Sequence, residues 1–92
     1  MKVTINFLGL FKEYIGTDLV SMELPEGSLF ADLLAEINRR YGEKLPKSLW
    51  DKGKGVFLPG ILCVGEGRDL EDVNTPLKSG ETISVVVHLA GG

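Results

Sequence analysis

Residues 82–92 have the sequence TISVVVHLAGG, and the prediction of the fold begins with them. Apolar residues alternate through its first part, with Ile83, Val85 and Val87 on one side, as is typical of a half-buried strand. Residues 2–8, KVTINFL, alternate in the same way. Because these are the two longest strands expected, we predict that they lie side by side at the centre of a sheet. A crossover between them makes the pair parallel.

An amphipathic helix is expected inside that crossover. Apolar residues recur every four positions from Leu29 to Tyr41, and this spacing puts them on one helical face that fits against a sheet. Ser28 is expected to cap the amino end, and Gly42 the carboxyl end. The pattern therefore predicts one main helix packed on one face of the sheet.

Shorter segments complete the sheet. Residues 20–24 alternate, and residues 61–64 and 68–70 flank a tight turn at 65–67. Residues 43–60 are rich in glycine and proline, which argues against a long element there, although Leu45, Leu49 and Trp50 can form a short apolar turn. The sequence predicts an α+β fold with a mixed sheet of four to five strands.

Composition narrows the class of protein. A chain of 92 residues with 43% apolar residues is expected to form a single globular domain over residues 1–92, with a flexible tail at about 89–92. The net charge of −3 argues against nucleic acid as a partner. One cysteine and one histidine predict neither an internal disulfide nor a metal site. We expect no signal peptide, no membrane span and a cytoplasmic location.

The chain ends with two glycines, Gly91 and Gly92. Glycine has no Cβ, so such an end can thread a narrow channel in backbone conformations that other residues resist. The carboxylate presented in this way can attack the α-phosphate of ATP in a partner enzyme, and a sulfur nucleophile can then displace AMP. The alternative interpretation is a solvated tail without a role.

The order of these elements resembles that of the ubiquitin-like β-grasp sulfur carriers, the MoaD/ThiS-like family. The chain looks most like the small subunit of molybdopterin synthase and its archaeal relatives. The resemblance covers nearly the whole length except residues 44–60. The matching segments are MKVTINF at 1–7, FKEYIGTD at 11–18, SLFADLLAEINRRYG at 28–42, TPLKSGETISV at 75–85 and AGG at 90–92.

This resemblance implies a carrier and not an enzyme. The carboxylate of Gly92, on the tail of Ala90 and Gly91, would be adenylated by an E1-like adenylyltransferase of the MoeB/ThiF type and converted to a thiocarboxylate. The large subunit of molybdopterin synthase would then receive the sulfur for molybdenum cofactor biosynthesis. The chain itself would bind no cofactor, since ATP is used by the partner. Alternatively, Gly92 would be conjugated to lysines of target proteins; a third interpretation is an interaction module with an inert tail.

A partner surface is expected on the sheet face that the helix leaves uncovered. By alternation, Leu8 and Val86 point to that face, and we expect Leu70 to join them from the neighbouring strand. Exposed apolar patches of this kind mark partner surfaces. The alternative is that Trp50 or Phe57, from the loop at 43–60, covers the patch.

Cys63, His88 and a group of acidic residues also have side chains that could take part in binding or catalysis. Cys63 lies in a predicted buried strand and is interpreted as a core residue. His88 begins the tail and is assigned to the partner surface, with a solvated position at the strand end as the alternative. Acidic residues in the last third either steer docking to a basic adenylating enzyme or form a solvated face; they are Glu66, Asp69, Glu71, Asp72 and Glu81.

Overall fold

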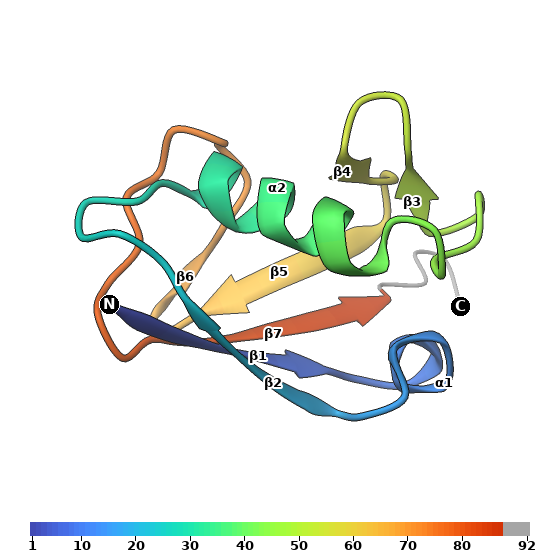
Figure 1. Cartoon of the computed structure of the whole chain (residues 1–92), viewed down its shortest axis with the longest axis horizontal. Helices are drawn as coiled ribbons and strands as arrows, with labels where there is room; N and C mark the ends of the chain where they lie inside the picture. Colours follow the sequence, from blue (N-terminus) through green and yellow to red (C-terminus); the bar gives the residue numbers. More distant parts are fainter. Residues whose placement is uncertain (88–92) are drawn as a thin grey trace.

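The computed structural model describes residues 1–87. Within this part of the chain, five strands form one mixed sheet in the order β2-β1-β7-β5-β6 (Figure 1). β1 (Lys2–Phe7) and β7 (Thr82–Val87) are neighbours at its centre and run parallel, with Phe7 opposite Val85. The predicted central pair is therefore confirmed.

The remaining strands flank this pair. β2 (Leu19–Glu23) is antiparallel to β1, and β5 (Ile61–Gly65) is antiparallel to β7. β6 (Arg68–Asp69) returns along β5 after a tight turn, with Gly65 opposite Arg68. A Cβ at Gly65 would collide with the Oε2 atom of Glu81, so a larger residue at this position would have to displace the buried Glu81 side chain.

The main helix is α2 (Phe30–Tyr41), which lies across one face of the sheet, while the short α1 (Leu10–Ile15) joins β1 to β2 (Figure 1). The expected cap at Ser28 is wrong. The Ser28 hydroxyl instead donates to the carbonyl oxygen of Pro25 at 2.7 Å. Leu29 occupies the cap position, and its N–H donates to the carboxylate of Asp32 at 2.7 Å. The helix ends at Gly42, as predicted.

Residues 43–60 contain a short antiparallel hairpin that the sequence did not predict. Its strands, β3 (Trp50–Asp51) and β4 (Val56–Phe57), have two residues each, which is too short for a recognisable alternation. The predicted apolar turn is confirmed, because Leu45, Leu49 and Trp50 are all buried. The hairpin stands beside the carboxyl-terminal half of α2 (Figure 1).

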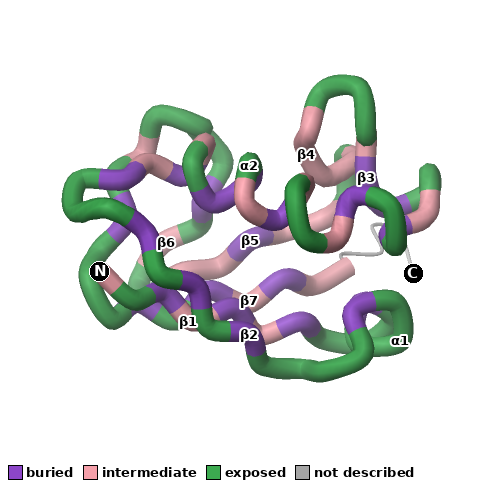
Figure 2. Tube along the Cα trace, in the orientation of Figure 1, coloured by how far each residue is buried: buried purple, intermediate pink, exposed green. Residues whose placement is uncertain are grey.

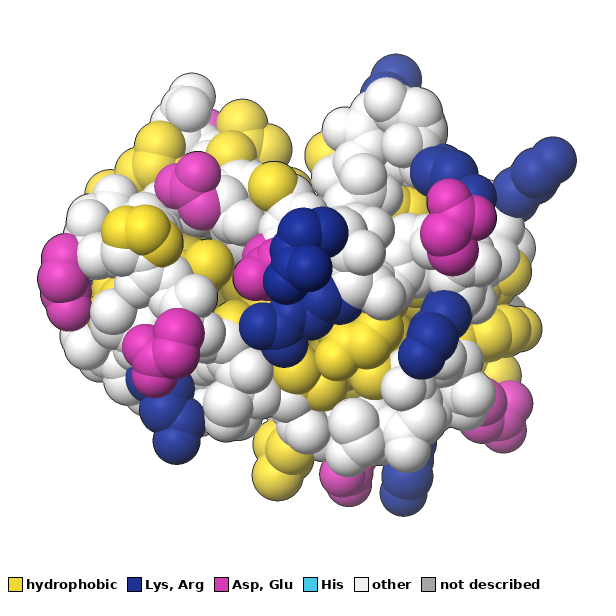
Figure 3. Space-filling model, viewed as in Figure 1, with side chains coloured by type: hydrophobic (Ala, Val, Ile, Leu, Met, Phe, Trp, Pro, Cys, Tyr) yellow, Lys and Arg dark blue, Asp and Glu magenta, His cyan; other side chains and the backbone are white. Residues whose placement is uncertain are grey.

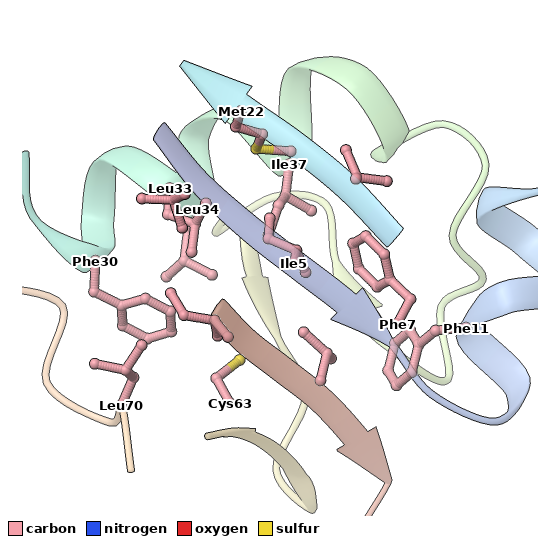
Figure 4. Packing of buried hydrophobic residues seen from close by; sticks show 14 of the residues in the cluster. Ile5, Phe7, Phe11, Met22, Phe30, Leu33, Leu34, Ile37, Cys63 and Leu70 are labelled. Carbon is pink, nitrogen blue, oxygen red and sulfur yellow. The ribbon is translucent and has the colours of Figure 1, made fainter. Parts of the chain in front are cut away.

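The core fills the space between α2 and the sheet (Figure 4). Buried and more exposed residues alternate along β1 and β2, so that each strand gives one face to the core (Figure 2). Full burial of a large apolar side chain stabilises the fold by about 1.5–3 kcal/mol. The largest fully buried apolar side chains are Trp50, Phe7, Phe11, Ile5, Met22, Leu33, Ile37 and Ile83. None of the helices in residues 1–87 has the length and apolar character needed to cross a membrane.

Candidate functional site

Three apolar residues form a row across the sheet face opposite α2. Leu62 on β5 lies directly opposite Val86 on β7. The N–H of Leu8 donates to the carbonyl oxygen of Val85 at 3.0 Å, which continues the parallel pairing and places Leu8 beside Val86. We call Leu8, Val86 and Leu62 the outer row. Leu8 is 41% exposed, and the other two are half-buried.

The orientation of the outer row follows from strand geometry. Successive side chains of a strand point to opposite faces, and the neighbouring residues Phe7, Val85 and Cys63 are all buried in the core. The prediction that Leu8 and Val86 point away from the helix is therefore confirmed. Their role in binding a partner stays a prediction.

The expected alternative cover of this face is wrong. The ring of Phe57 packs 4.7 Å from the ring of Trp50 and 5.6 Å from that of Phe11, centre to centre. Phe11 in turn lies 6.2 Å from Phe7, whose side chain is in the core. Trp50 and Phe57 therefore pack on the helix side of the sheet and leave Leu8 exposed.

The assignment of Leu70 to the exposed patch is also wrong. Leu70 is only 4% exposed and belongs to the core, where it lies beside Phe30 and Cys63 (Figure 4). Its N–H donates to the carbonyl oxygen of Cys63 at 2.7 Å. Residues paired across two strands point to the same face, so Leu70 follows Cys63 inward.

Leu62 takes the place that the sequence analysis gave to Leu70. It was missed because residues 61–64, ILCV, are all apolar and show no alternation. The turn supplied a usable signal: when Gly65 pairs with Arg68, Cys63 pairs with Leu70 and both must share one face. Leu62 then points to the opposite face.

The predicted tail residues His88, Ala90, Gly91 and Gly92 lie outside the described residues. The last described residue, Val87, is paired with Ile61 at the beginning of β5. The structure therefore shows where β7 ends, and the roles of these four residues stay predictions.

Cys63 is confirmed as a core residue. Its side chain is buried, and burial raises the pKa of the thiol to about 12. A thiol with this pKa stays protonated at neutral pH and is a poor nucleophile. Within residues 1–87, no group of three His, Cys, Asp or Glu side chains is arranged to hold a metal ion.

Glu81 is not part of the acidic surface expected in the last third of the chain. It is 1% exposed, and its carboxylate accepts hydrogen bonds from the Arg68 side chain and from the backbone N–H groups of Glu66 and Lys78. Burial alone would raise the pKa of the Glu81 carboxyl, but these hydrogen bonds hold it below its ordinary value. Only the other acidic residues can contribute to a charged surface.

Comparisons with known proteins identify the fold. No protein-family model matches the chain, and no curated protein matches it in sequence. SAMP1 from Haloferax volcanii has a similar structure, with a TM-score of 0.80 and 13% identity over 100% of both chains. A putative molybdopterin converting factor subunit 1 from Pyrococcus furiosus gives a TM-score of 0.73 and 24% identity over 97% of this chain and 99% of that one.

A third similar structure was solved together with its partner. The complex of subunits 1 and 2 of molybdopterin-converting factor from Helicobacter pylori matches with a TM-score of 0.64 and 22% identity over 100% of both chains. The resemblance noted from the sequence is thus confirmed as a shared ubiquitin-like β-grasp fold.

Proposed function

We propose that the chain is a sulfur carrier protein whose cargo site is the carboxyl group of Gly92. The main support for this proposal is the position of the strand that leads toward the end of the chain. The strand that leads toward Gly92 is β7, which is held between β1 and β5 in the middle of the sheet, in a fold shared with molybdopterin converting factor subunits. Because β7 is hydrogen-bonded on both sides, it gives the residues that follow it a fixed starting point for binding to another protein.

The chemistry needs no catalytic side chain from this chain. The Gly92 carboxylate attacks the α-phosphate of ATP bound to the partner, and pyrophosphate leaves. Sulfide-level sulfur (HS⁻) supplied by the donor then attacks the acyl carbon and displaces AMP, so that the adenylated carboxyl group becomes a thiocarboxylate. Because glycine carries no Cβ, Gly91 and Gly92 can pass through a channel too narrow for other residues. The carrier is a co-substrate that binds no cofactor of its own.

The outer row is the proposed docking surface for the partners. Apolar side chains grouped on one exposed face favour a protein interface, and the Helicobacter pylori protein was solved as a complex of two subunits. We propose an E1-like adenylating enzyme for activation and the large subunit of molybdopterin synthase for sulfur delivery, both in the cytoplasm.

A second candidate function is protein modification. SAMP1 stands for small archaeal modifier protein 1, and the Haloferax volcanii protein of that name matches over the full length of this chain. The same adenylate of Gly92 would then react with a lysine amine of a target protein and form an isopeptide bond. The two functions share the activation step and differ in the nucleophile.

The activation step can be tested first. Intact mass should establish that Gly92 ends the mature chain. The cognate E1-like enzyme should then exchange pyrophosphate into ATP only when the chain is present, and deletion of Gly92 should abolish the exchange. Exchange that continues undiminished with the deleted chain would contradict both functions. Sulfur on Gly92, as opposed to isopeptide adducts on cellular proteins, then distinguishes the carrier from the modifier.

A further inference from the structure

A hollow with a volume of about 550 Å³ lies on the segment that precedes the β3–β4 hairpin and on the hairpin itself. It is separate from the outer row and shares no residue with it. The residues around it are Leu45, Pro46, Lys47, Trp50, Asp51, Lys52, Gly53 and Leu58. We call it the Trp50 hollow.

The floor of the Trp50 hollow is apolar and held in place. Trp50 is 2% exposed, and its indole N–H donates to the Oδ1 atom of Asn38 on α2 at 2.8 Å. Its ring packs edge-on against Phe57 at 4.7 Å. The backbone N–H of Leu58 donates to the carbonyl oxygen of Leu49 at 3.0 Å. A floor fixed in this way can receive an apolar side chain with little cost of ordering.

The rim of the hollow is positively charged. Lys47 and Lys52 line it directly, while the carboxylate of Asp51 is engaged by the backbone N–H of Lys54 at 3.0 Å. Lys52 pairs with Glu43 at 2.7 Å, but both side chains are exposed, and such a pair exchanges easily for another carboxylate. Among residues 1–87, Lys47 forms no ion pair.

This charge is local, because the rest of the chain is acidic. Residues 36–54 contain six of the ten Lys and Arg residues but only three of the thirteen Asp and Glu residues. Figure 3 shows Lys and Arg side chains around the hairpin and the carboxyl-terminal half of α2. A basic island on an acidic protein attracts an acidic surface and repels a second basic one.

We propose that the Trp50 hollow binds an acidic segment of a partner protein. An apolar side chain of that segment enters the hollow, and carboxylates on either side of it pair with Lys47 and Lys52. The site lies close to the strand end that the proposed function uses, since Leu58 accepts a hydrogen bond from Ile61 at 3.2 Å and Ile61 pairs with Val87. Binding at the hollow does not require activation of Gly92.

The test uses a synthetic peptide, acetyl-Glu-Glu-Phe-Glu-Glu-amide, as the probe. Trp50 is the only tryptophan, so its fluorescence reports binding directly. We expect saturable binding that weakens with added salt. Replacing the peptide phenylalanine by glycine, or its glutamates by glutamines, should each weaken binding several-fold.

The charge-reversal variant K47E/K52E should bind the peptide at least about tenfold more weakly, since two attractive pairs become repulsive. The matched control K2E/K78E has the same net charge and should bind as the unmodified protein does. Equal binding by both variants, or no saturable signal with the unmodified protein, would overturn the proposal. Tighter binding of decauridylate to the same lysines would overturn it in favour of a nucleic-acid surface.

Discussion

The guanidinium group of Arg68 donates two hydrogen bonds to the buried carboxylate of Glu81, at 2.7 and 3.1 Å. The backbone carbonyl of Glu81 also accepts from the N–H of Thr4 at 3.0 Å. This pair therefore joins the β5–β6 hairpin to the beginning of β7 and to β1. It fixes the end of the central strand opposite to the one that leads to Gly92.

Replacing Arg68 by alanine should destabilise the fold by about 3 kcal/mol, because it leaves the Glu81 carboxylate buried without its cationic partner. Chemical denaturation with urea measures the change. Arg39→Ala is the control, since Arg39 pairs with Glu36 on the surface of α2, and it should leave the midpoint unchanged. Similar losses in the two variants would contradict the special role of the buried pair.

The lowered pKa of Glu81 predicts how stability depends on pH. A carboxyl whose pKa is lower in the folded state stabilises the fold above its unfolded-state pKa, which is about 4.3 for glutamate. That contribution is lost as the pH falls through the lower folded-state value. The free energy of unfolding should therefore decline below about pH 4.3. Glu81→Gln should flatten this decline, and an unchanged pH profile in that variant would exclude Glu81 as its source.

Substitution by aspartate should change the free energy of unfolding little at Leu8 and strongly at Leu70. Leu8→Asp adds a charge to an exposed position and should change the free energy of unfolding by no more than about 0.5 kcal/mol. Leu70→Asp buries an unpaired charge in the core and should cost at least about 4 kcal/mol. Circular dichroism during thermal unfolding compares the two. A folded, stable Leu70→Asp protein would show that Leu70 lies on the exposed face and not in the core.

The outer row should matter for partner binding without mattering for folding. Leu8→Asp should weaken binding of the cognate E1-like enzyme at least about tenfold, because a charge would be placed in an apolar contact. Isothermal titration calorimetry measures the affinity. Ser21→Asp is a matched control, since Ser21 is exposed on the same sheet face but lies on β2, outside the row. Equal affinities of the two variants for the enzyme would show that the outer row is not part of the interface.

Much of the fold was predictable because the long strands follow simple rules. The alternation in residues 2–8 and 82–88 identified the central pair, and a parallel pair needs a crossover, which the apolar stripe of α2 supplies. The side-chain direction of Leu8 and Val86 followed from the same alternation. Short elements lack this signal, so the β3–β4 hairpin was not foreseen.

The wrong predictions concern side chains whose positions are set by strand pairing and hydrogen bonding and not by residue type or alternation. Leu70 points inward because the turn pairs it with Cys63, and a change of one residue in register reverses every side chain. Ser28 has a side chain that can cap a helix, but its hydroxyl donates to the carbonyl oxygen of Pro25 instead. Glu81 resembles a surface carboxylate until Arg68, thirteen residues earlier, is brought against it. The sequence alone carries no sign of that pairing.

We propose above all that the Gly92 carboxyl group carries sulfur. The most direct measurement is the intact mass of the chain after incubation with its cognate E1-like enzyme, ATP and a sulfur donor. We predict that one oxygen of the terminal carboxylate is replaced by sulfur, and that fragmentation places the change on Gly92. An unchanged mass under conditions that convert a control carrier, or sulfur bound to Cys63 in place of Gly92, would exclude the Gly92 carboxyl group as the sulfur-carrying site.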